Sequence, residues 1–351
     1  MKILFVNFIK FWGGGESWTY QVMDELRKRN HNVVLLSNSE SKLLSKSKIG
    51  HFETHSFPIN KASFLNFSQQ AKIRQELIDI KPDVIILNSS LELKTIGLTI
   101  KDCGCSKVIF TRGIPFRIKM NPLKRYLLSN VVTDVVVNSN YVKNSILNLE
   151  KYLKNPPVVI YHGIDPDTLL KAIGNTKKIA IVGRLSEEKG IDIAIELMPN
   201  ILQLHPDAEL WIMGDGKEKQ KLENLTSKLG IQQSVKFWGF VTDVEKLLLQ
   251  CSMLIMTSRW EGFGLVLLEA MKLQIPCLAF DHIAANEIII NNETGYLIPD
   301  MSIDLMSEKI NYLLSNPDFA RQMGQKGNER LRSNFTIDES INQYEKIMSK
   351  L

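Results

Sequence analysis

The stretch "CSMLIMTSRWEGFGLVLLEAMK", residues 251–272, predicts the fold of the whole chain. Its first eight residues are mostly apolar, which is typical of a parallel strand buried on both faces. Gly262 and Gly264 then predict a turn, and residues 265–272 have the composition of a helix. A strand, a glycine turn and a helix in this order are the repeating unit of an α/β protein.

The same alternation runs through the chain twice. In the first half, five apolar runs are separated by helical patterns, two of which are expected at about residues 17–30 and 68–80. The pattern starts again at "KKIAIVGRL", residues 177–185, and continues through five more apolar runs. We therefore expect two Rossmann-like domains, each with a doubly wound parallel sheet.

The join between the two domains is expected near residue 170, because prolines and glycines interrupt any helix or strand between residues 156 and 166. The expected domains are residues 1–170 and residues 171–335. Residues 336–351 are expected to form an amphipathic helix that packs across the domain junction. Its apolar face would contain Ile337, Ile341, Tyr344 and Met348.

The composition is that of a folded protein, with 44% apolar and 23% charged residues. Charge is uneven, because residues 1–173 contain 24 Lys and Arg against 14 Asp and Glu, whereas the remainder contains 19 against 24. A basic first half fits an anionic membrane surface or a phosphorylated acceptor, or an ordinary solvated face. No apolar run reaches 18 residues, no signal peptide is evident, and the four cysteines are expected to be reduced, so a cytoplasmic protein is expected.

Ligands of open α/β sheets bind where strands end, and two strand-to-helix turns have suitable residues. Three consecutive glycines at residues 13–15 allow a ligand to approach the backbone, although a plain tight turn is the alternative. They do not fit the dinucleotide pattern G-x-G-x-x-G. In the turn "GRLSEEKG", Arg184 and Lys189 can together hold one diphosphate, and ordinary solvated charges are the alternative.

Glu261 and Glu269 lie on either side of the turn in the opening stretch. Glu261 falls in the loop after the strand, whereas Glu269 falls one turn into the helix. The N–H groups of Phe263, Gly264 and Leu265 can face a hydroxyl or phosphate oxygen. The Glu269 carboxylate can accept two hydrogen bonds from a vicinal diol such as ribose. The alternative is a partly buried capping pair, which is costly for a carboxylate without a donor.

Six motifs occur in a characteristic order: "GGGE", "GRLSEEKG", "LWIMGDG", "FWGFV", "EGFGLVLLEAM" and "NNETGYLIP". In order and spacing they resemble the retaining glycosyltransferases of the GT-B fold, the group 1 family that includes sucrose-phosphate synthases and bacterial mannosyl- and glucosyltransferases. The resemblance covers nearly the whole chain and is closest in the C-terminal half.

The resemblance implies a GT-B architecture in which the two domains face a central cleft and the second domain holds a nucleotide-diphosphate sugar. It implies transfer to an acceptor hydroxyl with retention of configuration, and no metal or other cofactor. The implied catalytic residues are Glu261 on the sugar and Arg184 and Lys189 on the diphosphate. Arg112 is a further catalytic candidate, at a position where this chain departs from the family. Among the implied donor-binding residues, Phe240 and Val241 would lie beside the base and Glu269 would hold the ribose. The others are Gly14, Gly15, Gly183, Gly262, Phe263, Gly264 and Leu265.

Two places depart from the pattern of this family. Arg112 and Gly113 stand where many members have a histidine, and Arg112 is a candidate for contacting a phosphate or an acceptor anion. Ala284 and Ala285 stand where the family commonly has paired glycines, which leaves the local sugar contact open. An apparent D-x-D at residues 165–167 lies in the linker around a proline, so no metal is expected there.

The acceptor side is expected at residues 112–126, where five basic residues alternate with apolar ones. This pattern fits an anionic lipid surface or a lipid-linked acceptor, and hence a peripheral position on the inner face of a membrane. No nucleic-acid motif is present. The expected function is hexose transfer in bacterial surface polysaccharide or lipopolysaccharide biosynthesis; the alternatives are a sugar-nucleotide epimerase of the same fold or a non-catalytic nucleotide-sugar-binding module.

Overall fold

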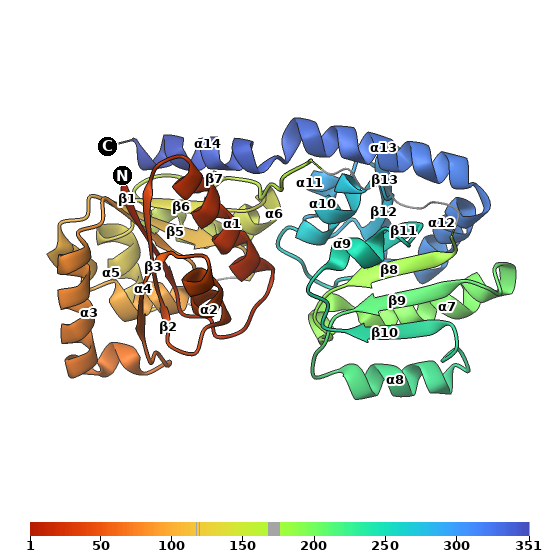
Figure 1. Cartoon of the computed structure of the whole chain (residues 1–351), viewed down its shortest axis with the longest axis horizontal. Coiled ribbons are helices and arrows are strands. Elements are labelled where there is room, and N and C mark those ends of the chain that lie inside the picture. The colour runs from red at the N-terminus through yellow and green to blue at the C-terminus, as the bar shows by residue number, and fades with distance from the viewer. Residues whose placement is uncertain (117, 119, 168–175, 351) are drawn as a thin grey trace. The chain divides into compact units, whose positions relative to one another are not determined.

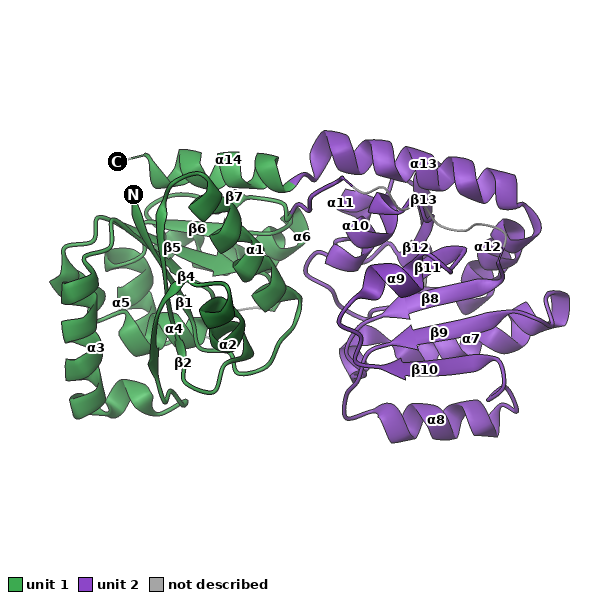
Figure 2. Cartoon of the chain, viewed as in Figure 1, with its two compact units in different colours: residues 1–162, 337–351 green, residues 163–336 purple. Residues whose placement is uncertain are grey.

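The computed structural model describes residues 1–116, 118, 120–167 and 176–350. The chain forms two compact units, of which unit 1 contains residues 1–162 and resumes at residue 337, and unit 2 contains residues 163–336 (Figures 1 and 2). The boundary thus follows His162, earlier than the predicted position near residue 170.

The C-terminal helix α14 (Ile337–Met348) belongs to unit 1, where it packs against α1 (Gly14–Lys28). Its apolar face is buried as the sequence pattern predicts. Arg29 at the end of α1 holds this helix through Glu345 at 2.7 Å and Asp338 at 2.9 Å. The expected contact of α14 with the second domain stays a prediction.

Unit 1 contains a parallel sheet of seven strands in the order β3-β2-β1-β4-β5-β6-β7. The strands are β1 (Lys2–Asn7), β2 (Asn32–Asn38), β3 (Glu53–Phe57), β4 (Val84–Leu87), β5 (Lys107–Arg112), β6 (Asp134–Val137) and β7 (Val158–Val159). The five predicted strands are confirmed as the buried ones. The edge strand β3 is polar and β7 has two residues, so neither shows the apolar run of a buried strand. The strand order reverses beside β1, which is where doubly wound sheets bind ligands.

The helices of unit 1 begin at side chains that cap them. Ser41, Asn66, Ser89, Asn121 and Ser139 each accept a hydrogen bond from a backbone N–H in the first turn of the helix that follows. The helices predicted near residues 17–30 and 68–80 are confirmed as α1 and α3. The other helical segments are α2 (Lys42–Ile49), η1 (Ser63–Leu65), α3 (Phe67–Ile80), α4 (Ser90–Ile96), η2 (Ile100–Cys103), α5 (Pro122–Asn130), α6 (Asn140–Ser145) and η3 (Leu147–Tyr152).

Unit 2 contains a parallel sheet of six strands in the order β10-β9-β8-β11-β12-β13, and all six were predicted. The strands are β8 (Lys178–Val182), β9 (Glu209–Met213), β10 (Val235–Gly239), β11 (Met253–Met256), β12 (Cys277–Phe280) and β13 (Gly295–Ile298). The helical segments are η4 (Glu187–Lys189), α7 (Ile191–Leu204), α8 (Lys219–Lys228), α9 (Val244–Leu248), α10 (Leu265–Lys272), α11 (Ala285–Ile288), η5 (Pro299–Met301), α12 (Ile303–Ser315) and α13 (Pro317–Asn334).

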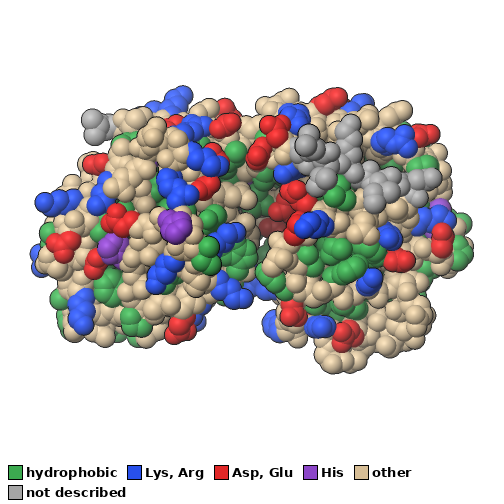
Figure 3. Space-filling view, in the orientation of Figure 1, with side chains coloured by type: hydrophobic (Ala, Val, Ile, Leu, Met, Phe, Trp, Pro, Cys, Tyr) green, Lys and Arg blue, Asp and Glu red, His purple; other side chains and the backbone are tan. Residues whose placement is uncertain are grey.

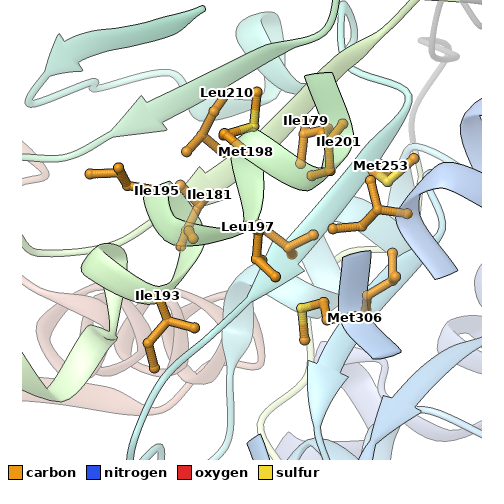
Figure 4. Packing of buried hydrophobic residues seen from close by; sticks show 14 of the residues in the cluster. Ile179, Ile181, Ile193, Ile195, Leu197, Met198, Ile201, Leu210, Met253 and Met306 are labelled. Carbon is orange, nitrogen blue, oxygen red and sulfur yellow. The ribbon is translucent and has the colours of Figure 1, made fainter. Parts of the chain in front are cut away.

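A large apolar core joins the sheet of unit 2 to α7 and α12. Side chains such as Ile181 of β8, Leu197 of α7 and Met306 of α12 are at most 2% exposed (Figure 4). Burial of this size holds β8 and α7 rigidly, and therefore fixes the turn between them.

The cysteines and the charged side chains of the surface can be compared with the expectations from the sequence. The four cysteines are free, as predicted. Basic and acidic side chains are interspersed over both units on the face drawn in Figure 3. No helix in the described ranges is long and apolar enough to cross a bilayer.

Candidate functional site

The turn after β8 is fixed to the turn after β11 by Gly190. This residue has a φ of +59°, and a Cβ atom on it would lie 2.0 Å from the carbonyl oxygen of Thr257. The Thr257 hydroxyl donates a hydrogen bond to the Gly190 carbonyl at 2.7 Å. Because only glycine allows this approach, two turns that are distant in the sequence meet at the carboxyl end of the sheet.

Arg259 strengthens the same junction. Its guanidinium donates two hydrogen bonds to the Asp192 carboxylate, at 2.8 and 2.6 Å, and one to the Glu187 carbonyl oxygen at 2.9 Å. A bidentate pair of this kind fixes orientation, and hydrogen bonding from Arg259 lowers the pKa of Asp192. The sequence analysis missed Arg259, whose only signal is its position directly after an apolar strand.

Lys189 and Glu261 are brought together by this junction. The Lys189 ammonium group pairs with Oε2 of Glu261, and the two side chains are 24% and 19% exposed. Oε1 of Glu261 accepts a hydrogen bond from the Gly262 N–H at 3.2 Å. The residue predicted to meet the diphosphate therefore lies against the residue predicted to meet the sugar, although 72 positions separate them in the chain.

Arg184 lies on the same turn as Lys189 and is 56% exposed. Its Nη2 atom is 3.5 Å from Oε1 of Glu188. Burial opposes ionisation of Glu188, but the Ser186 hydroxyl and the charges of Arg184 and Lys189 outweigh it and lower the pKa of this carboxyl. Two basic side chains thus lie within one short turn, and solvent reaches Arg184.

Three glycines let the turns after β8 and β9 touch. A Cβ atom on Gly214 would lie 1.8 Å from the Gly183 carbonyl oxygen, and one on Gly216 would lie 2.3 Å from the Leu185 carbonyl oxygen. The Gly183 N–H also donates to the Met213 carbonyl at 3.0 Å. Gly183 was a predicted site residue, whereas Gly214 and Gly216 appeared only as letters of a motif. Their role is to hold the Arg184 loop in place.

The start of α10 matches the turn and helix predicted from the opening stretch. Gly264 precedes the helix with a φ of +99°, and no side chain caps the helix. Leu265 is the first helical residue, and Phe263 is buried with its ring 6.0 Å from that of Phe335. Glycine suits position 264 because this positive φ strains other residues and a Cβ atom would lie 3.2 Å from the Met256 side chain. The first N–H groups of α10 are left without a capping side chain.

Glu269 lies on α10 and is half-buried. Burial, and next the charge of Glu245, raise its pKa to about 7, while Lys272 acts in the opposite direction. Lys272 pairs with Glu245 at 3.0 Å. Within the described parts of the chain no hydrogen bond to the Glu269 carboxylate is found. The side chain is only half-buried, so a ligand hydroxyl can reach this carboxylate and donate a hydrogen bond to it.

Phe240 and Val241 follow β10 at the same edge of the sheet. Gly239 turns the chain with a φ of +69°, and its carbonyl accepts a hydrogen bond from the Gly214 N–H at 2.8 Å. Phe240 is 61% exposed.

The segment with alanines in place of glycines lies after β12. Ala284 and Ala285 are both fully buried, and Ala285 begins α11, which also contains Glu287. His282, which the sequence analysis overlooked, faces the Arg259 carbonyl oxygen through Nε2 at 3.0 Å. Its Nδ1 atom is buried and has no hydrogen-bond partner in the residues that the structure describes.

In unit 1 the predicted glycines open α1. Gly14 and Gly15 are exposed, no side chain caps the helix, and a Cβ atom on Gly15 would meet nothing within 4 Å. The fully buried Glu92 accepts hydrogen bonds from the Phe8 N–H, in the loop after β1, at 2.7 Å and from the Ser89 hydroxyl. Burial raises the pKa of Glu92. This carboxyl, which the sequence did not single out, fixes the loop between β1 and α1.

Arg112 is the last residue of β5, on the same edge of the unit 1 sheet. Its Nη2 atom donates to the Phe116 carbonyl oxygen at 2.9 Å, and burial lowers its pKa. Arg117 and Lys119 of the predicted acceptor stretch lie outside the described residues.

The apparent D-x-D motif is engaged within the linker. Oδ1 of Asp165 accepts a hydrogen bond from the Asp167 N–H at 2.9 Å, and Asp167 pairs with Arg332 at 3.1 Å. No group of three acidic, histidine or cysteine side chains suited to a metal occurs among the described residues.

Family models match both halves of the chain. The model described as glycosyl transferases group 1 matches residues 170–330, and the model described as glycosyltransferase family 4 matches residues 12–168. The chain belongs to the group 1 glycosyltransferases. This glycosyltransferase is 26% identical over 348 residues to an "uncharacterized glycosyltransferase" of Haemophilus influenzae, a match that covers 96% of both chains.

Solved structures share the fold of this glycosyltransferase. HepE of Anabaena, in complex with UDP and glucose, has a TM-score of 0.86 at 20% identity, and the match covers 100% of both chains. The lipopolysaccharide outer core galactosyltransferase WaaB, in its apo form, has a TM-score of 0.76 at 20% identity, again over 100% of both chains. The predicted GT-B fold, with two Rossmann-like parallel-sheet domains, is confirmed.

Proposed function

We propose that this glycosyltransferase moves a hexose from a nucleotide-diphosphate sugar to a hydroxyl of a bacterial surface glycan or of its lipid-linked precursor, with retention of configuration. The observation that carries the proposal is the contact between Lys189 and Glu261, with Arg184 on the same turn. In a nucleotide-diphosphate sugar the diphosphate is bonded directly to the sugar. A site for it therefore needs basic groups next to a carboxylate that can bind sugar hydroxyls.

The remaining groups of unit 2 fit the rest of such a donor. Glu269 would accept hydrogen bonds from the ribose hydroxyls, and Phe240 would lie beside the base. UDP-sugars are the first donors to test, because the structurally similar HepE binds UDP and glucose. A lipopolysaccharide or polysaccharide acceptor is supported by the likeness to WaaB.

In the proposed reaction the bond between the anomeric carbon and the β-phosphate oxygen breaks as the acceptor oxygen bonds to the same carbon on the same face. The acceptor proton passes to the leaving phosphate. Negative charge grows on the diphosphate, and Arg184 and Lys189 offset it without a metal. Removal of one such donor typically costs about 10²–10³ in kcat.

Unit 1 would meet the acceptor at a membrane surface from the cytoplasmic side. Ile114 and Phe116 are 51% and 49% exposed, and the basic Lys124 and Arg125 follow them on α5. Apolar side chains beside basic ones suit a peripheral contact with anionic lipid.

The test is incubation of the purified chain with UDP- and GDP-sugars and a lipid or glycan acceptor. Release of nucleoside diphosphate and of a glycosylated product that depends on the acceptor is expected. Turnover of the donor with no acceptor and no free nucleotide would instead indicate an epimerase, and binding without turnover would indicate a non-catalytic module.

A further inference from the structure

Arg112 has an unsatisfied donor at the carboxyl end of the unit 1 sheet. Its backbone is fixed by pairing of β5 with β6, where Arg112 is opposite Val137. The Nε atom is buried and has no hydrogen-bond partner, and no carboxylate in the described part of the chain pairs with this guanidinium. A buried N–H group without an acceptor is unfavourable, and a ligand with acceptor oxygens would remove that penalty.

Two lysines add positive charge around Arg112. Lys94 is on α4 and Lys124 is on α5, and these two helices pack against each other. Burial, followed by the charges of Lys94 and Arg112, lowers the pKa of Lys124. Like charges at this range repel, so an anion among them would stabilise the cluster.

An unsatisfied acceptor lies directly beside the unsatisfied donor. Asn138 follows β6, and its Oδ1 atom is buried and has no hydrogen-bond partner among the described residues. Gly113 lets this side chain approach, because a Cβ atom on Gly113 would lie 3.0 Å from Nδ2 of Asn138. The Arg112 guanidinium and the Asn138 amide therefore lie at the same edge of neighbouring strands. Together they suit a ligand in which a hydroxyl is next to an anionic group.

We propose that Arg112, Lys94 and Lys124 bind a phosphoryl group carried by the acceptor, and that Asn138 meets a hydroxyl next to it. The proposal rests on the function proposed above and names the class of acceptor as a phosphorylated glycan. The planar guanidinium matches phosphate oxygens, and the two lysines supply the remaining charge. The Arg112 side chain is half-buried, so a flat anionic membrane meets it less readily than a discrete phosphate monoester or diester, which is the ligand proposed.

The test is a ³¹P NMR titration of the full chain with glycerol 3-phosphate, in saturating UDP so that the basic turn of unit 2 is occupied. Wild type should bind glycerol 3-phosphate, and Arg112→Gln should weaken binding about ten-fold or more. Lys124→Gln should weaken it less. Lys72→Gln is the matched control, because Lys72 is an exposed residue on α3 and its loss removes the same charge from unit 1. A native far-UV circular dichroism spectrum and a cooperative melting transition show that Arg112→Gln is folded.

Two results would overturn the proposal. One is equal binding of glycerol 3-phosphate by wild type and Arg112→Gln. The other is binding only to vesicles of phosphatidylglycerol over phosphatidylcholine, with no binding of glycerol 3-phosphate, because a membrane surface would then be the ligand. The proposed donor function fails through a different measurement, because wild type would then not bind UDP.

Discussion

Replacement of Glu269 by glutamine should make the protein more stable at alkaline pH and weaken its binding of nucleotide. Burial raises the pKa of Glu269 from 4.5 to about 7, so the folded state holds a proton that the unfolded state has already released. Stability therefore falls as pH rises from about 4.5 to 7 and is constant above that range. The loss amounts to about 3 kcal/mol once the carboxyl is ionised. Glutamine cannot ionise, so Glu269→Gln should avoid this loss.

Calorimetric melting of wild type and Glu269→Gln at pH 5 and pH 8 measures the effect. The variant should melt only slightly higher at pH 5, where less than about 1 kcal/mol of the loss has appeared, and higher by roughly 6–12 °C at pH 8 for a domain of this size. UDP should bind the variant about ten-fold more weakly, because the carboxylate is lost as a hydrogen-bond acceptor for ribose. A variant that is less stable at pH 8 and binds UDP as tightly as wild type would refute the reasoning.

Three further predictions concern the junctions and the chemistry. Gly214→Ala should lower the free energy of unfolding by about 3 kcal/mol or more, because the new Cβ atom would meet the Gly183 carbonyl. Gly230→Ala, at an open site of positive φ, should lower it by only about 1–2 kcal/mol. Equal losses of the two variants in urea unfolding would contradict this. Arg259→Gln should lower the free energy of unfolding by about 1–2 kcal/mol, because the ion pair with Asp192 is lost. Arg321→Gln, which breaks an exposed ion pair, should change the free energy of unfolding little. Urea unfolding compares the two variants, and equal losses would show that the Asp192 pair has no special role. Transfer should proceed unchanged in EDTA, because Arg184 and Lys189 supply the charge, and activity that returns only with added Mg²⁺ or Mn²⁺ would show a metal requirement.

The repeated strand, turn and helix pattern was enough to predict the fold, because parallel strands buried on both faces have continuous apolar runs. It predicted β8 to β13 and placed the start of α10 at Leu265. It missed β3, which is a polar edge strand that the apolar pattern does not reveal.

The sequence singles out candidate site residues, which stay predictions, but it does not reveal the contacts between them. The pairing of Lys189 with Glu261 depends on how closely Gly190 approaches Thr257, and a backbone contact across 67 positions leaves no local signal in the chain. Arg259 and the buried Glu92 act through such contacts too, which is why composition and spacing did not identify them.

The central claim is that Arg184 and Lys189 hold the diphosphate while Glu261 holds the sugar. Titration calorimetry of UDP and UDP-glucose with wild type, Arg184→Gln and Glu261→Gln tests it most directly. Arg184→Gln should weaken both ligands about ten-fold, because both contain the diphosphate. Glu261→Gln should weaken only UDP-glucose and leave UDP as tight or tighter, because Lys189 is released from its pair. Equal weakening of UDP and UDP-glucose by Glu261→Gln, or none of either ligand by Arg184→Gln, would contradict the assignment.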